Sequence, residues 1–202
     1  MLIQICSNLT ERFIRNGILD QSLTDWCIYW LQKKILTALA VSLMLILGSP
    51  IFGFDVTICF LLGLFPLRRR LIGYHTKSPH TCIILSVGIM LLALLVNSTF
   101  NQRISQVFSL VNFIICLMLV VCVLSDQTDP RLHLTREEVK ENHRLAVQIL
   151  ALVSVAGVVV ALLLHSSQCL SSCQMGIMAA VSSAAYNKLK QIMEASTHEK
   201  NH

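Results

Sequence analysis

The stretch GSPIFG, residues 48–53, interrupts an apolar block that otherwise runs from residue 35 to residue 67. As a single helix this block would be about 50 Å long at 1.5 Å per residue. The apolar core of a bilayer is only about 30 Å thick. Glycine and proline so close together are typical of a turn or a helix break. The sequence therefore predicts two short spans over 35–67, or a hairpin that does not fully cross.

Three further apolar stretches carry no Asp, Glu, Lys or Arg, and each is close to the roughly 20 residues of a membrane span. They are residues 81–98, 104–125 and 145–164. A weaker span at about 171–187 is rich in small residues that suit close packing against another helix. The chain is 13% charged, whereas soluble domains have roughly 25% charged residues. We therefore expect an all-α polytopic membrane protein with about six transmembrane helices.

The first 34 residues precede these spans. Leu2, Leu9 and Phe13 recur every three to four residues between charged positions, which predicts an N-terminal amphipathic helix on the membrane surface. An ordinary packed helix is an equally open interpretation. The length of 202 residues fits one membrane domain. Its parts are an amphipathic or juxtamembrane region over 1–34 and a transmembrane bundle over 35–190.

The charge distribution predicts the orientation of the chain. With a hairpin at 35–67, 15 of the 16 Lys and Arg residues lie on one side of the membrane and only Arg103 on the other. A single span there would divide them 11 to 5. Because basic loops stay inside, the first arrangement is favoured. It predicts that both termini, the stretch 68–82 and the loop 125–144 are cytoplasmic.

The most basic stretch is RRRLIGYHTKSPHTC, residues 68–82. Proline suits the first position of a helix and serine suits the N-cap, so the next membrane helix is expected to begin at Ser78 and Pro79. Cys82 then lies in its first turn at the cytoplasmic rim. The helix dipole and the neighbouring basic side chains favour a reactive thiolate there.

A histidine precedes this cysteine by seven residues. In one continuous helix His75 would be too far from Cys82 for a hydrogen bond, but Gly73 and Pro79 allow the chain to fold back. His80 is closer in sequence, yet residues two apart on a helix point in different directions. A Cys/His pair suits acyl transfer, in which histidine takes the thiol proton and the thiolate attacks a carbonyl. On these residues alone, a structural loop–helix junction is the commoner alternative.

Other chemistry has less support in the sequence. The eight cysteines show no disulfide-like or CxxC pattern, and we expect no metal site and no cofactor. Cys169 and Cys173 could pair or do nothing. An acidic residue of the loop 125–143, or Asn142, could orient His75 as a third catalytic group. We interpret His133 and His143 as solvated loop residues.

The Arg-rich–G-Y-H-x-K-[ST]–x3–C motif, between the second and third of six predicted spans, resembles the accessory gene regulator B (AgrB) family. These proteins are membrane cysteine endopeptidases of Gram-positive quorum sensing. His75 and Cys82 match the catalytic positions of the family, and Gly73 and Arg68 match a family glycine and arginine. Lys77 continues the run after the histidine. The chain departs from the family pattern at Ile72, where a second glycine is common, and at Thr76, which replaces a common alanine.

The resemblance implies a function. A precursor peptide of the AgrD type, held at the membrane lipid, is cut before its acidic C-terminal tail. The new carboxyl stays on the cysteine as a thioester, and an internal Cys or Ser then closes a thiolactone or lactone ring. We expect Arg68, Arg69, Arg70 and Lys77 to bind the acidic tail. The resemblance also implies a homodimer in the cell membrane, and we expect no nucleic-acid partner. The alternative is a non-catalytic membrane partner or scaffold, such as a transporter subunit or signalling component.

Overall fold

The computed structural model describes residues 2–71, 79–123 and 136–199 of the chain. Within these ranges all regular structure is helical, as predicted for an all-α protein. The chain divides into two compact units, residues 1–43 and 44–202, with the boundary inside α2. A single membrane domain over 1–202 stays a prediction.

The first unit contains α1 (Leu2–Arg15), the short 3-10 helix η1 (Gln21–Leu23) and the beginning of α2 (Thr24–Phe52). α1 ends just before Gly17, which has a φ of 69°, and Asp20 caps η1 by accepting a hydrogen bond from the Ser22 amide. A helix is thus present where the N-terminal pattern predicted one. Its location on a membrane surface stays a prediction.

The predicted break within the apolar block is confirmed. α2 ends at Phe52 and α3 (Phe54–Arg68) follows directly. The break occurs at Gly53, whose φ of 95° is strained for any residue with a side chain. Pro50, by contrast, lies within the last turns of α2. α2 also begins at Thr24, well before the predicted start of the bundle at residue 35.

Four helices in the described ranges are long and apolar enough to cross a membrane. They cover Gln21–Phe52, Thr81–Ser98, Gln102–Cys122 and Glu137–Leu163. The predicted spans at 81–98, 104–125 and 145–164 each coincide with one of them. α3, with 15 residues, is too short for this group, and the C-terminal helix is not part of it. The total of about six spans therefore stays a prediction.

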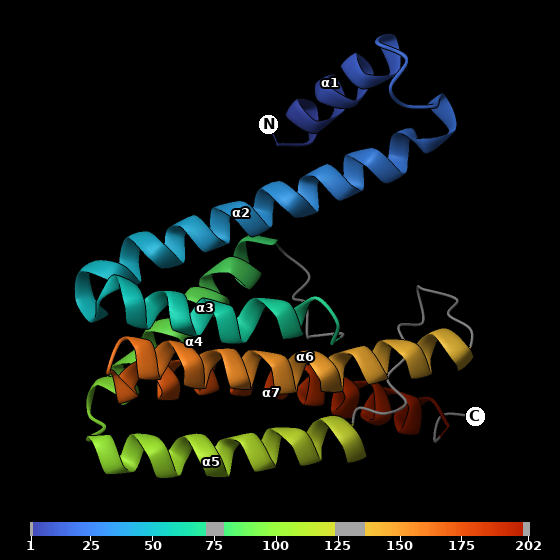
Figure 1. Ribbon diagram of the computed structural model, residues 1–202. Coiled ribbons are helices and arrows are strands. Elements are labelled where there is room, and N and C mark those ends of the chain that lie inside the picture. The colour runs from blue at the N-terminus through green and yellow to red at the C-terminus, as the bar shows by residue number, and fades with distance from the viewer. Residues whose placement is uncertain (1, 72–78, 124–135, 200–202) are drawn as a thin grey trace. The chain divides into compact units, whose positions relative to one another are not determined.

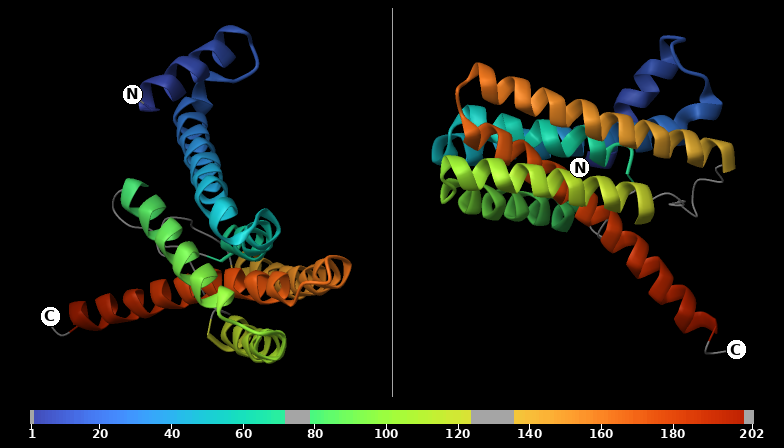
Figure 2. Two further views of the ribbon diagram at one scale, coloured as in Figure 1. Left: turned by 90° about the vertical axis from the view of Figure 1, so that its left-hand side faces the viewer. Right: turned by 60° about the horizontal axis from the view of Figure 1, so that its bottom comes forward.

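The second unit is a helical bundle arranged around its last helix. It contains the end of α2, α3, α4 (Pro79–Ser98), α5 (Gln102–Met118) with the π-helical turn η2 (Leu119–Val123), α6 (Arg136–Leu163) and α7 (Ser167–Glu199). α7 packs against α3, α4, α5 and α6, and most extensively against α3 (Figure 1). The C-terminal half of α7 projects beyond the other helices of this unit (Figure 2).

Two glycines allow α3 and α7 to approach closely. A Cβ added at Gly63 would collide with the carbonyl oxygen of Cys173, and one added at Gly176 would collide with the carbonyl oxygen of Phe60. Ala180 and Ala184, further along α7, are also buried. The prediction that this small-residue face packs against another helix is confirmed. The face is covered within the chain, so the expected homodimer stays a prediction with no support from this surface.

Polar side chains fasten α7 to its neighbours inside the bundle. Asn97 of α4 donates to the Gln168 carbonyl over 3.1 Å and accepts from the Ser171 hydroxyl. Asn112 of α5 donates to the Gln174 carbonyl over 2.8 Å. Further bonds run from Ser105 to the Ser167 carbonyl, from Ser172 to the Val56 carbonyl and from Gln174 to the Ser154 hydroxyl. Hydrogen bonds between membrane helices contribute about 0.6 kcal/mol on average, so several together help to fix the register of α7.

Candidate active site around Cys82

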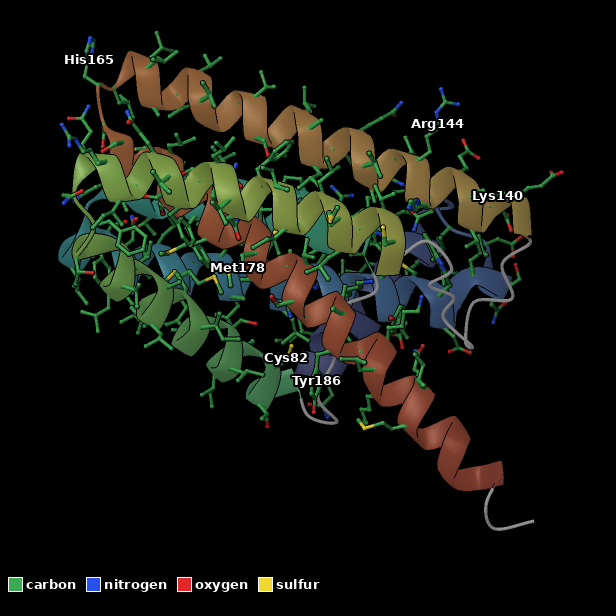
Figure 3. The ribbon with its side chains drawn as sticks, turned by 90° about the horizontal axis from the view of Figure 1, so that it is seen from below. Cys82, Lys140, Arg144, His165, Met178 and Tyr186 are labelled. Carbon is green, nitrogen blue, oxygen red and sulfur yellow. The ribbon has the colours of Figure 1, made fainter. Side chains whose placement is uncertain are left out.

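Cys82 lies where the sequence predicted it, in the first turn of α4 (Figure 3). The helix begins at Pro79, which confirms the expected start of this span with proline at the first helical position. The Cys82 side chain is half-buried. A thiol in this position is close to the positive end of the helix dipole and can still be reached from outside the bundle.

The Arg68 guanidinium, at the end of α3, points at this turn of α4. Its Nη2 lies 3.5 Å from the Cys82 Sγ, within hydrogen-bonding range for sulfur. Its Nη1 donates to the Ser86 Oγ over 3.0 Å. Arg68 was expected to bind the substrate tail. That role stays a prediction, and the structure gives its guanidinium two partners on α4.

The end of α3 is anchored by packing and by hydrogen bonds. Leu67 and Leu71 are buried, and the Leu71 amide donates to the Leu67 carbonyl over 2.8 Å. Asn142 of α6 donates from Nδ2 to the Arg70 carbonyl over 2.9 Å. These contacts hold the backbone on both sides of Arg69, so the base of the Arg68 side chain is fixed as well.

Several predicted site residues fall outside the described part of the chain. Gly73, His75 and Lys77 belong to the segment 72–78. The pairing of His75 with Cys82 and the structural role expected of Gly73 therefore stay predictions. Asn142 was considered as a group that orients His75, and its described contact is with the Arg70 carbonyl.

Two basic side chains of α6 lie on the face opposite the Asn142 contact with α3. Lys140 and Arg144 are exposed and are spaced four residues apart, so they share one face of α6 (Figure 3). Asn142 lies between them in sequence and contacts Arg70. Arg69 and Arg70 are exposed too. The exposed guanidinium groups of Arg69 and Arg70 attract anionic groups such as phosphates and carboxylates.

One histidine differs from its expected environment. His143 was interpreted as a solvated loop residue, and that interpretation is wrong. It lies within α6, half-buried, with Nε2 3.3 Å from the Val120 carbonyl. Val120 belongs to the π-helical turn η2. The ring nitrogen therefore serves as a donor for a carbonyl of η2.

The cysteines other than Cys82 offer no comparable setting. All eight are free thiols, and most are buried. Cys169 and Cys173, whose spacing had left a pairing open, are not joined. Among the described residues, no group of three His, Cys, Asp or Glu side chains is placed to hold a metal ion. Cys122 is the one cysteine with an exposed side chain.

The sequence pattern missed Ser86 entirely. Its only signal is its spacing of four residues from Cys82, which puts both on one face of α4. That spacing becomes informative only in the folded protein, where α3 brings Arg68 to the same face of α4. The site thus holds a thiol beside a permanent positive charge, and the group that carries this charge is also hydrogen-bonded to a neutral hydroxyl.

Comparison with known proteins adds one finding to this geometry. The family model described as Accessory gene regulator B matches residues 6–184. The match includes the whole stretch 68–82 and the greater part of every helix of the bundle. The comparisons with curated proteins and with solved structures each found no match. Because the family model spans most of the sequence, the chain belongs to the accessory gene regulator B family.

Proposed function

We propose that the chain is a membrane cysteine endopeptidase that processes a quorum-sensing precursor peptide of the AgrD type. Membership of the family supports a part in the processing of such a peptide. The observation that carries the enzymatic proposal is the position of Cys82, half-buried in the first turn of α4 with the Arg68 guanidinium 3.5 Å from its sulfur. A positive charge in this position stabilises a thiolate.

The proposed reaction has two steps. His75 takes the proton of the Cys82 thiol, and the thiolate attacks the carbonyl of the scissile peptide bond. The imidazolium then protonates the leaving amine, so the acidic tail departs and the precursor remains attached to Cys82 as a thioester. An internal thiol or hydroxyl of the peptide next attacks the thioester. The ring closes, and the Cys82 sulfur is released with a proton. No nucleotide is required, because the thioester preserves the activation of the acyl group.

We assign the binding of the acidic tail to Arg69, Arg70 and Lys77. The side chains of Arg69 and Arg70 are exposed at the end of α3, whereas the Arg68 guanidinium has its partners on α4. Charge-assisted hydrogen bonds between guanidinium and carboxylate groups are about twice as strong as neutral ones. Reversing the charge of Arg69 and Arg70 should weaken processing, and basic residues placed in the precursor tail should restore it. Processing that stays unchanged when only the two arginines are reversed, or when only the precursor tail is reversed, would count against this assignment.

Co-expression with the precursor tests the enzymatic proposal. We expect the neighbouring reading frame to encode this short peptide. Cys82→Ala and His75→Ala should abolish cleavage, measured from the masses of the precursor and its fragments. Cys122→Ala and His165→Ala are matched controls, because both side chains are exposed and neither belongs to the site. A hydroxylamine-sensitive adduct on Cys82 would identify the thioester.

If both site variants process the precursor as well as the wild type, the enzymatic proposal fails. The chain would then act as a non-catalytic membrane partner, and its Cys/His pair would be structural. Cleavage lost equally in the two controls would point to a general effect on folding and would also remove the support for a specific nucleophile.

A further inference from the structure

The Arg68 guanidinium bridges two side chains of α4 that are one helical turn apart. One of its terminal nitrogens faces the Cys82 Sγ at 3.5 Å, and the other donates to the Ser86 Oγ over 3.0 Å. A guanidinium is a rigid, planar fork. Holding one of its terminal nitrogens therefore fixes the direction of the other.

The kind of partner at the second position matters for the charge. A carboxylate there would neutralise the guanidinium, and the positive charge beside the sulfur would lose most of its effect. A serine hydroxyl accepts the hydrogen bond and carries no net charge. Ser86 can thus hold Arg68 while the whole charge stays available to the sulfur. Both contacts are partly buried, and the attraction between charges is less screened there than in water.

We propose that Ser86 is a positioning residue, whose hydroxyl keeps the Arg68 guanidinium against Cys82 and thereby stabilises the thiolate. That Cys82 acts as a nucleophile rests on the proposed function. The positioning of Arg68 by Ser86 does not, because it concerns only the reactivity of the Cys82 thiol. A purely structural link between α3 and α4 would leave the chemistry of the thiol unchanged.

The test is the pH dependence of Cys82 alkylation by iodoacetamide in the full-length, detergent-solubilised protein, followed by mass spectrometry of the Cys82 peptide. Ser86→Ala should slow alkylation of Cys82 at pH 7 by about threefold or more, since an opposite charge within about 4–6 Å favours an ionised group by about tenfold or more. Ser86→Thr keeps a hydroxyl and should restore the wild-type profile. Cys122, exposed in the same chain, provides an internal reference that should not change.

A second variant, Arg68→Gln, tests the same contact if Ser86→Ala does not fold. Arg68→Gln retains an amide donor but removes the charge, so it should slow Cys82 alkylation at least as much as Ser86→Ala does. Ser98→Ala is the matched control on α4, because the Ser98 hydroxyl bonds only within its own helix, to the Leu95 carbonyl. An unchanged Cys82 profile in Ser86→Ala or in Arg68→Gln would overturn the proposal.

The alkylation experiment does not depend on precursor processing. If Cys82→Ala still processes the precursor, the proposed function fails while the alkylation profiles can still establish the positioning. If the profiles do not move but Cys82→Ala is inactive, the positioning fails and the proposed function stands. The two ideas are therefore separable by experiment.

Discussion

The crossing of α3 and α7 gives the sharpest prediction for stability. In Gly176→Ala the added Cβ would collide with the Phe60 carbonyl oxygen and would lie 2.9 Å from the Leu64 nitrogen and 3.1 Å from the Phe60 carbonyl carbon. All three atoms belong to the backbone of α3. No side chain can rotate away to make room, so the two helices must separate.

The matched control is Gly88→Ala in α4, where an added Cβ meets nothing within 4 Å. Both changes replace a helical glycine by alanine and should gain the same helix propensity, about 0.8–1.0 kcal/mol. That gain cancels in the comparison. Overpacking a tight contact costs about 1–3 kcal/mol, so Gly176→Ala should be less stable than Gly88→Ala by about this amount.

The measurement is the free energy of unfolding from a titration of the detergent-solubilised protein with SDS, followed by helical circular dichroism. Gly63→Ala, on the other side of the crossing, should behave like Gly176→Ala. Because both residues belong to one contact, the double variant should lose less than the sum of the two single losses. Equal stability of Gly176→Ala and Gly88→Ala would refute the close approach of these helices.

Three further predictions concern single contacts. Asn97→Ala, which removes the bonds to the Gln168 carbonyl and Ser171, should lower the free energy of unfolding by about 0.6–1.7 kcal/mol in the same titration. Gly53→Ala should cost about 1–3 kcal/mol, because its backbone conformation is nearly restricted to glycine. Asn142→Ala should speed hydrogen exchange in the last turn of α3 by about two- to twelvefold, as expected for a hydrogen bond worth about 0.5–1.5 kcal/mol.

Each of these has a control on a neighbouring residue or element. Ser98→Ala serves for Asn97, because its hydroxyl bonds only within α4. Gly88→Ala serves for Gly53 as a glycine with free space around it. Lys140→Ala serves for Asn142 as an exposed neighbour on α6. A control that loses as much as its test variant would contradict the contact in question.

The sequence predicted those features that depend on local chemistry. Gly53 ends a helix because its conformation excludes side chains, and Pro79 begins one because proline lacks an amide hydrogen. Such effects need no knowledge of the rest of the fold. The start of α2 at Thr24 was missed because a window free of charges locates only the apolar part of a helix. α2 begins before that window and includes Lys33 and Lys34.

Other features were missed because they depend on which helices meet. Asn112 and Gln174 are isolated polar residues in the sequence, and only the packing of α5 against α7 makes them partners. Ser86 likewise has no signal until α3 brings Arg68 to α4. His143 appeared to lie in a polar loop, but α6 begins at Arg136 and carries it to the Val120 carbonyl. Local patterns cannot supply such pairings.

The polar face of α7 also has a consequence for biosynthesis. This helix follows α3, α4, α5 and α6 in the chain, so its hydrogen-bond partners on those helices are synthesised before it. Apolar helices can enter lipid one at a time, but a helix with polar groups is stable there only where those groups find partners. The hydrogen bonds inside the bundle are therefore completed only when α7 packs against the helices made before it. A chain that stops before Ser167 would leave the side-chain amide donors of Asn97 and Asn112 without their partners inside an apolar bundle.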